Sequence, residues 1–204
     1  MAEQPILVGR PALIVVDIQK GAFLEGDGGI PHMPGYREAM LRARRLIDAA
    51  RANGVPVVFI QEVHRPDGVD FGRELDGSET EHCVEGRPGT PIAAEEMDFR
   101  PGDYHVPKRR YSAFYGTDLE ILLKGLKADT LVLVGGLTDV CVHYTFADAH
   151  QGDYYTRVVT DCVGGSSVAA HEASLRAMEY LQTGACRSAD EIIAAFAAHR
   201  AEAA

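Results

Sequence analysis

Cys141 is the residue best placed to do chemistry. It follows a short apolar run and a glycine pair in the stretch T-L-V-L-V-G-G-L-T-D-V-C, residues 130–141. A buried strand that ends at glycines and leads into a helix is a standard place for a reactive group at the carboxyl end of a parallel sheet. A free thiol, with a pKa of ~8.5, is only about 3% ionised at pH 7, but a helix N-terminus or a nearby cation can lower that pKa. Position alone leaves two interpretations open: a nucleophile, or a thiol that fills the corner between strand and helix.

Two distant residues could serve such a thiol. Asp17 ends the apolar run 12–16, where an unpaired buried charge is costly. Its carboxylate could accept the thiol proton and return it to a leaving group, or it could cap a helix or pair with a basic residue. Lys108 follows a short predicted strand, but beside Arg109 and Arg110 it could equally belong to a charged surface patch.

Predicted strands and helices alternate along the chain and would position these side chains. Apolar and β-branched runs predict strands at 12–16, 55–60, 104–106, 131–134 and 155–160. Helical spacing and capping boxes predict helices at 36–53, 117–126, 140–150 and 167–181, and a last one that starts at 188. This alternation predicts a three-layer α/β fold with a mostly parallel sheet. We find no internal repeat or linker, so we expect a single domain over residues 1–204.

The composition excludes several classes of protein. Of the 204 residues, 46% are hydrophobic and 25% charged, as in an ordinary globular domain. No apolar run approaches the roughly 20 residues that span a bilayer, and the first ten residues do not resemble a secretory signal. A net charge of −10 without a basic stripe argues against nucleic acid as a partner. The four cysteines form no C-x-x-C pair, so we expect reduced thiols in a cytoplasmic protein.

Three separated motifs resemble the isochorismatase-like cysteine hydrolases, which include nicotinamidase and N-carbamoylsarcosine amidohydrolase. They are D-I-Q at 17–19, K-R-R-Y-S-A-F-Y-G-T at 108–117 and G-G-L-T-D-V-C-V-H-Y-T-F-A-D-A at 135–149. The resemblance extends from about residue 11 to 195 and implies that family's α/β/α sandwich with six strands. It also implies a triad in which Asp17 is general base and then general acid, and Lys108 stabilises the thiolate. Cys141 would attack a carbonyl carbon and form a thioester.

The resemblance implies further features of the site. A cis peptide bond would join Gly136 to Leu137, and the N–H groups of Leu137 and Cys141 would form an oxyanion hole. Glycine at 136 departs from the branched residue often found there and leaves a smaller pocket wall. The residues expected to line the substrate pocket are Gln19, Phe23, Tyr111, Phe114, Gly136 and His143.

The long polar segment 64–102 resembles the metal-binding segment of nicotinamidases. Q-E-V-H at 61–64 and E-H-C at 81–83 place Glu62, His64 and His82 where that family binds a divalent ion. A carboxylate and two imidazoles suit Zn, Mn or Fe. Glutamate stands in place of aspartate, and Asp70 stands where a further histidine is expected, so the alternative is that both histidines are ordinary polar loop residues. The triad itself needs no cofactor.

These motifs predict a nicotinamidase-like cysteine amidohydrolase that uses water to cleave the carboxamide or ureido C–N bond of a small molecule. One alternative is a vinyl-ether hydrolase of the isochorismate type, but such relatives typically lack the cysteine that Cys141 supplies. Another is a catalytically inactive binding protein on the same fold. Family members are usually oligomeric, so we expect a homo-oligomer in which a neighbouring subunit could cover the pocket. The particular substrate stays open.

Overall fold

A six-stranded sheet forms the centre of the computed structural model, which describes residues 5–24 and 30–203. The spatial order of its strands is β3-β2-β1-β4-β5-β6, and every neighbouring pair is parallel. The strands are β1 (Pro11–Val16), β2 (Val57–Glu62), β3 (Tyr104–Lys108), β4 (Thr130–Gly136), β5 (Tyr155–Gly164) and β6 (Cys186–Arg187). The predicted parallel α/β fold is confirmed, and the two-residue β6 is the strand that the apolar runs did not reveal.

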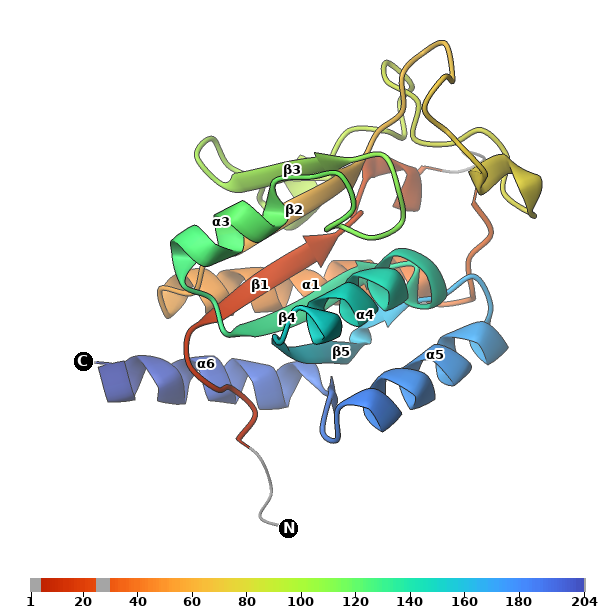
Figure 1. The fold of residues 1–204 in the computed structure, drawn as a ribbon. Coiled ribbons are helices and arrows are strands. Elements are labelled where there is room, and N and C mark those ends of the chain that lie inside the picture. The colour runs from red at the N-terminus through yellow and green to blue at the C-terminus, as the bar shows by residue number, and fades with distance from the viewer. Residues whose placement is uncertain (1–4, 25–29, 204) are drawn as a thin grey trace.

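Helices cover both faces of this sheet (Figure 1). On one face lie α1 (Tyr36–Ala52) and α6 (Ala189–Ala203), and on the other lie α3 (Leu119–Leu126), α4 (His143–Gln151) and α5 (Val168–Leu181). The shorter turns are η1 (Lys20–Ala22), η2 (Glu74–Asp76), α2 (Ala94–Met97) and the π-helical turn η3 (Thr138–Val142). No helix among the described residues is both long and apolar enough to cross a membrane.

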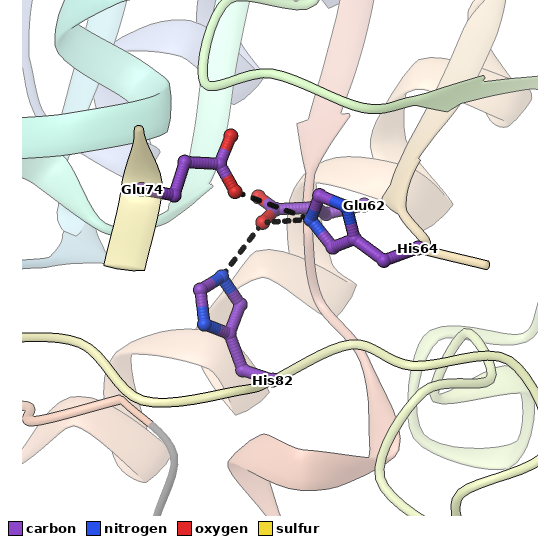
Figure 2. A group of neighbouring side chains, drawn as sticks. All are labelled: Glu62, His64, Glu74 and His82. Carbon is purple, nitrogen blue, oxygen red and sulfur yellow. Dashed lines mark hydrogen bonds and ion pairs between the residues drawn. The ribbon is translucent and has the colours of Figure 1, made fainter. Parts of the chain in front are cut away.

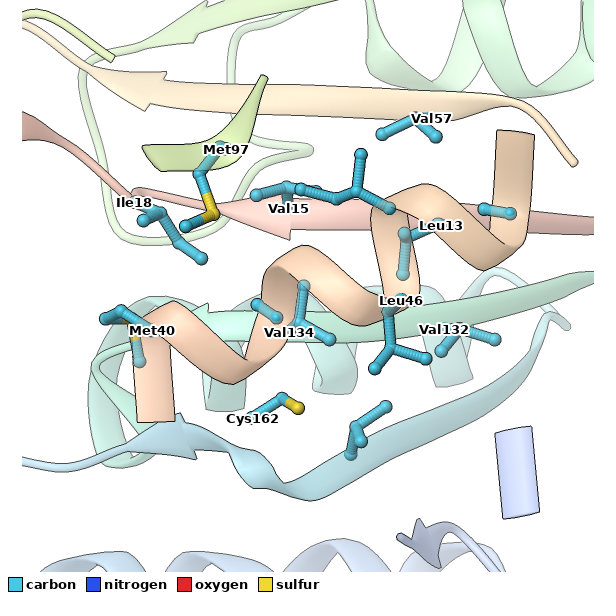
Figure 3. Packing of buried hydrophobic residues seen from close by; sticks show 14 of the residues in the cluster. Leu13, Val15, Ile18, Met40, Leu46, Val57, Met97, Val132, Val134 and Cys162 are labelled. Atoms are coloured by element: carbon cyan, nitrogen blue, oxygen red, sulfur yellow. The ribbon is translucent and has the colours of Figure 1, made fainter. Parts of the chain in front are cut away.

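Strand β1 is buried on both faces, which explains why all its residues are apolar. Leu13 and Val15 point to the layer of α1, where they pack with Met40 and Leu46 (Figure 3). Ile14 and its even-numbered neighbours point to the layer of α3 and α4. Because side chains alternate between two covered faces, a central parallel strand buries every residue.

The two predicted capping boxes have different outcomes. Ser188 and Glu191 form one at the start of α6, where the Glu191 carboxylate accepts the N–H of Ser188 at 2.8 Å. The prediction at the start of α3 is wrong, because Glu120 pairs with Lys124 on the exposed side of the helix. Thr117 still accepts a hydrogen bond from a backbone N–H, that of Leu119, at 3.2 Å.

The carboxyl ends of the central strands meet at one edge of the sheet and place the site. Asp17 directly follows β1, and Leu137 directly follows β4. Glu62 and Lys108 end β2 and β3 and are register partners across that pair. The long segment between β2 and β3 lies over this edge (Figure 1). Parallel strands therefore bring together groups that are far apart in the sequence.

Candidate active site

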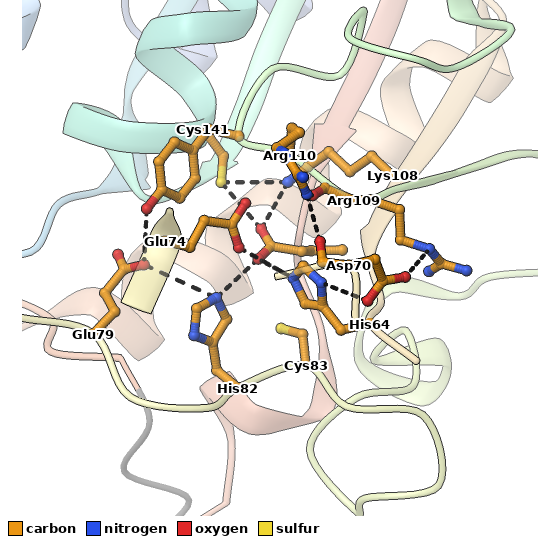
Figure 4. Close-up of polar contacts among 12 residues, drawn as sticks. His64, Asp70, Glu74, Glu79, His82, Cys83, Lys108, Arg109, Arg110 and Cys141 are labelled. Atoms are coloured by element: carbon orange, nitrogen blue, oxygen red, sulfur yellow. Dashed lines mark hydrogen bonds and ion pairs between the residues drawn. The ribbon is translucent and has the colours of Figure 1, made fainter. Parts of the chain in front are cut away.

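The Lys108 ammonium lies at the centre of the site. Its Nζ is 2.9 Å from Asp17 Oδ2 and 2.8 Å from Glu62 Oε2. The same nitrogen is 3.4 Å from Cys141 Sγ (Figure 4). The lysine is 1% exposed, so it does not belong to a surface patch. A buried ammonium needs paired and hydrogen-bonded anions. The carboxylates of Asp17 and Glu62 supply them, and the Cys141 sulfur is a third contact.

Backbone contacts hold Asp17 in this cluster. Asp17 adopts a left-handed conformation with φ +50°, a costly backbone state for a residue with a side chain. The N–H of Glu62 donates to Asp17 Oδ1 at 2.8 Å and to Gln19 Oε1 at 3.0 Å. The Gln19 amide in turn donates to the carbonyls of Glu62 and Thr90. Gln19 thus connects the ends of β1 and β2 to the segment 63–103, the covering segment, which lies over this edge of the sheet.

The pKa shifts in the site favour a neutral Cys141 thiol before substrate binds, beside an Asp17 carboxyl group that can gain or lose a proton near neutral pH. Burial raises the pKa of the Cys141 thiol well above its usual value, and the Lys108 ammonium only partly offsets this effect. Burial also raises the pKa of Asp17 to about 6, against the lowering influence of Lys108. Burial alone would raise the pKa of Glu62, but Lys108 and two histidines hold it well below its usual value. Asp17 is therefore the stronger base of the two carboxylates near the thiol.

Side chains on either side anchor the turn that carries Cys141. The peptide bond between Gly136 and Leu137 is cis, and Thr138 Oγ1 lies 2.9 Å from His171 Nδ1 of α5. Asp139 accepts hydrogen bonds from the N–H and hydroxyl of Ser166, at 2.8 Å and 2.5 Å. These contacts fix η3 against the start of α5.

Glu62 also belongs to a second cluster. Its Oε1 is 2.8 Å from His82 Nε2 and 3.2 Å from His64 Nε2 (Figure 2). Glu74 Oε2 lies 3.2 Å from His64 Nε2 as well. All four side chains are buried, and one ligand atom from each lies within 4.8 Å of the others. Glu62 therefore links this cluster to Lys108 and Cys141.

This cluster fits a divalent ion. Two imidazoles and two carboxylates are ligands suited to Zn, Mn or Fe. Both Glu74 oxygens are buried, and among the described residues the His64 ring, 3.2 Å from Oε2, is the partner that the Glu74 carboxylate has. Burial alone would lower the pKa of His64, but Glu62 and Glu74 raise it to about 9. The two carboxylates thus require positive charge between them, which a bound ion also provides.

The sequence did not single out Glu74. It lies in η2 within the long segment 63–103, where several acidic residues were equally eligible and no motif spacing favoured one. Asp70, at the position of the family's further histidine, contacts the ring nitrogen of His64 that faces away from Glu62 and Glu74. Its Oδ1 is 3.4 Å from His64 Nδ1, and its other oxygen pairs with Arg65 and Arg109. The chain thus places a carboxylate from a later turn at the fourth ligand position.

A cavity opens above Cys141. Of the residues predicted to line it, Gln19, Tyr111 and Gly136 do so, as do Leu137 and Cys141. The other described residues that line it are Asp17, Gly21, Ala22, Ile30, His32, Tyr36, Glu62, Glu79, Glu81, His82, Cys83, Arg87, Gly89, Thr90 and Val140.

Three predicted pocket residues lie outside that lining. The η1 turn presents Ala22 to the cavity, whereas Phe23 packs against the core beneath α1 and under Arg37. Phe114 packs against the core on the opposite face of the sheet. His143 is half-buried at the start of α4, beside Tyr144. These positions correct the prediction.

Tyr36 lines the cavity, although no motif in the sequence pointed to it. It begins α1 and stacks on His32, with ring centroids 4.7 Å apart. A Cβ at Gly136 would lie 2.3 Å from the Tyr36 hydroxyl oxygen. The tyrosine ring therefore occupies the space that a branched residue at 136 would take.

Comparisons with known proteins agree with this architecture. Residues 11–191 match the model of the isochorismatase domain, and the chain belongs to the isochorismatase family. It is 34% identical to the ureidoacrylate amidohydrolase RutB of Methylorubrum extorquens over 86% of this chain and 74% of that protein. It is 33% identical to the maleamate amidohydrolase of Pseudomonas putida over 81% of this chain and 78% of that protein.

A solved structure with this fold holds zinc. The pyrazinamidase of Pyrococcus horikoshii, solved in complex with zinc, superimposes with a TM-score of 0.75. The two proteins are 26% identical, and the match covers 88% of this chain and 99% of that one. Hydrolytic activity is thus common among named relatives, and one of them is known with a metal ion.

Proposed function

We propose that this protein is a cysteine amidohydrolase that cleaves the C–N bond of a small carboxamide or ureido compound through a thioester on Cys141. One observation carries the proposal: a thiol, an ammonium and a carboxylate of raised pKa are in contact at the floor of a cavity. The names of the related amidohydrolases support the same reaction class. Cys141 favours this reaction over vinyl-ether hydrolysis, which needs no thiol.

The first half of the reaction forms the thioester. As Cys141 Sγ attacks the carbonyl carbon, Asp17 accepts the thiol proton, and the Lys108 ammonium stabilises the negative charge on sulfur. The N–H groups of Leu137 and Cys141 stabilise the oxyanion of the tetrahedral intermediate. The C–N bond then breaks, and Asp17 gives its proton to the departing nitrogen, which leaves as ammonia or an amine.

The second half consumes one water molecule. Asp17, again ionised, accepts a proton from water as the water oxygen attacks the thioester carbon. The C–S bond breaks, the acid product leaves, and the proton held by Asp17 returns to the Cys141 sulfur. The net reaction converts an amide and water into a carboxylic acid and ammonia or an amine.

A divalent ion would be held by Glu62, His64, Glu74 and His82. Once bound there it would supply a Lewis-acid centre beside the cavity to which an electron-rich atom of a substrate could attach. His82 and Glu62 already line the cavity. The triad carries out its proton transfers with its own residues, so we assign the ion to substrate positioning.

Ammonia release tests the proposal. Purified protein is assayed with nicotinamide, N-carbamoyl amino acids, biuret-like ureas and maleamate, and Cys141→Ala is assayed beside it. We expect at least one substrate to release ammonia with the wild type and none above background with the variant. Cys186→Ala, which removes a half-buried thiol outside the cavity lining, is the matched control and should stay active.

Three results would contradict the proposal. Equal ammonia release by the wild type and Cys141→Ala would exclude covalent catalysis by this thiol. Release of pyruvate from isochorismate without ammonia from any amide would assign the alternative hydrolase reaction. Inactivity on the whole panel, with Cys141 no faster than Cys162 toward iodoacetamide, would favour a binding protein. The homo-oligomer remains a prediction, which the mass of the protein in solution tests.

A further inference from the structure

The wall of the cavity above Cys141 carries an acidic side chain that the reaction does not use. Glu79 comes from the segment after η2, lines the cavity, and its side chain is 15% exposed. The Tyr111 hydroxyl donates to Glu79 Oε2 at 3.3 Å, and His82 Nε2 lies 3.9 Å from the same oxygen (Figure 4). Tyr111 itself stacks on Tyr144, with ring centroids 5.7 Å apart. The carboxylate is therefore held in place at the cavity wall.

The cations near the cavity already have partners. Lys108 lies between Asp17 and Glu62. Arg87 is the one arginine or lysine among the described residues that line the cavity, and its guanidinium pairs with Glu81 at 2.7 Å. The Arg87 side chain is 48% exposed, so it belongs to the rim and not to the floor. Among the described residues, four carboxylates thus line the cavity against one guanidinium, and the His82 imidazole, which also lines it, already pairs with Glu62 at 2.8 Å.

This distribution of charge bears on the class of substrate. Among the described residues, no free ammonium or guanidinium would receive a substrate carboxylate that approaches Glu79. A divalent ion in the histidine cluster would be neutralised by its own ligands Glu62 and Glu74, so it would not cancel this repulsion. At an effective dielectric constant of ~20, two like charges about 6 Å apart weaken binding by about tenfold or more. An uncharged amide does not meet this repulsion, and N–H groups of such a substrate can donate to the Glu79 carboxylate.

We propose that the cavity selects uncharged or cationic amides and disfavours amides that carry a carboxylate, with Glu79, held by Tyr111, as the residue that determines this specificity. The inference rests on the proposed function, because it concerns the substrate of that reaction. It separates this chain from relatives named for ureidoacrylate and maleamate, which are both carboxylates.

Maleamide and maleamate form a matched pair of probes. They have nearly the same shape, and maleamide replaces the carboxylate of maleamate by a second uncharged carboxamide. Initial rates of ammonia release give kcat/KM for each, and we expect the wild type to favour maleamide by about tenfold or more. A wild type that favours maleamate would overturn the proposal, and loss of that preference in Arg87→Gln would then identify Arg87 as the anion-binding residue.

Glu79→Gln tests the residue itself. Glutamine keeps the size of the side chain and an acceptor for the Tyr111 hydroxyl but removes the charge. We expect kcat/KM for maleamate to rise by about tenfold relative to maleamide. Glu120→Gln removes an exposed carboxylate on α3, outside the cavity lining, and should leave the ratio unchanged. An unchanged ratio in Glu79→Gln would overturn the assignment.

Binding to Cys141→Ala separates this proposal from the proposed function. The variant cannot form a thioester, so calorimetric titration gives Kd for both probes without turnover. A lower Kd for maleamide, lost in Glu79→Gln/Cys141→Ala, supports the specificity even if the wild type hydrolyses neither probe. Equal Kd values for maleamide and maleamate would overturn it even if the wild type proves to be an amidohydrolase.

Discussion

The Glu62 carboxylate is shared by the two clusters of the site. One oxygen contacts Lys108 at 2.8 Å and Cys141 at 3.5 Å, and the other contacts His64 and His82. Aspartate, which the family usually places here, is shorter by one methylene. The longer side chain lets one carboxylate reach both groups, so the charge state of the histidine cluster is electrostatically coupled to that of Lys108 and Cys141.

Glu62→Gln should destabilise the protein markedly. The change leaves Lys108 with one anionic partner and removes the charge that pairs with His64 and His82. Breaking a buried ion pair costs about 3–5 kcal/mol. Chemical denaturation should show this loss, whereas Arg87→Gln breaks an exposed pair and should cost about 1 kcal/mol or less. Similar free energies of unfolding for the two variants would contradict this role of Glu62.

The pH dependence of the reaction should report Asp17. Its pKa is raised to about 6 by burial, against the opposing influence of Lys108. Only the ionised carboxylate can accept the thiol proton, so kcat/KM should be constant well above pH 6 and fall as the pH decreases through that value. Asp17→Asn should be inactive throughout. A flat profile from pH 5 to 8, with the fold intact by circular dichroism, would exclude Asp17 as the base.

Individual residues differ in how far the sequence could reveal them. Asp17, Lys108 and Cys141 stand in motifs, and the structure brings them into contact. Glu74 and Tyr36 stand in no motif. Their positions depend on how an irregular segment and the start of a helix fold over the sheet, which local residue patterns do not determine.

At the scale of elements, one aromatic ring packs between the start of α1 and the end of β4. A Cβ at Gly136 would lie 2.3 Å from the hydroxyl oxygen of Tyr36, and one at Gly164 would lie 2.6 Å from its ring. The first residue of α1 thus packs directly on the ends of β4 and β5. A side chain at either glycine would overlap the Tyr36 ring and displace it.

Gly136→Ala should therefore disturb both stability and activity. Overpacking a close contact costs about 1–3 kcal/mol, and the displaced Tyr36 ring would move into the cavity. Gly77→Ala is the control, because Gly77 has a negative φ and nothing within 4 Å of the added methyl group. In a Tyr36→Ala background the penalty of Gly136→Ala should shrink. Equal penalties in both backgrounds, measured by thermal denaturation, would show that Tyr36 does not impose glycine at 136.

The elements divide into those that the sequence predicted and those that it did not. The central strands were predicted because continuous apolar runs are needed where both faces are covered. Strand β2 and strand β3 extend two residues further than predicted, and those extra residues include Glu62 and Lys108. A charged residue at the end of a strand appears as loop in a hydrophobicity pattern, although here it is buried and part of the site.

At the scale of the whole molecule, the histidine cluster joins the covering segment to the sheet. Glu62 ends β2, whereas His64, Glu74 and His82 come from the segment 63–103 that crosses the strand ends. One of the four side chains is thus supplied by the sheet and three by the covering segment. An ion bound to all four would link the two parts, and tighter binding would stabilise the folded protein more.

Metal content and thermal stability should therefore change together. Protein purified without a nickel column should contain about one Zn, Mn or Fe per chain by elemental analysis, and removal of the ion should lower Tm. At a free ion concentration of 100 times Kd, an ion that binds only the folded state adds about 2.7 kcal/mol. His64→Ala/His82→Ala should contain little metal, and its Tm should not respond to added zinc.

The controls decide whether such a response belongs to this cluster. His199→Ala removes a half-buried histidine of α6, outside the cluster, and should keep both the metal and the zinc-dependent rise in Tm. Limited proteolysis should cut the segment 63–103 faster in the metal-free wild type than in the metal-bound form, because three of the four residues that would hold the ion lie in that segment. Equal and negligible metal in the wild type and His64→Ala/His82→Ala would remove the ion from the mechanism. The buried Glu74 carboxylate would then pair with protonated histidines alone.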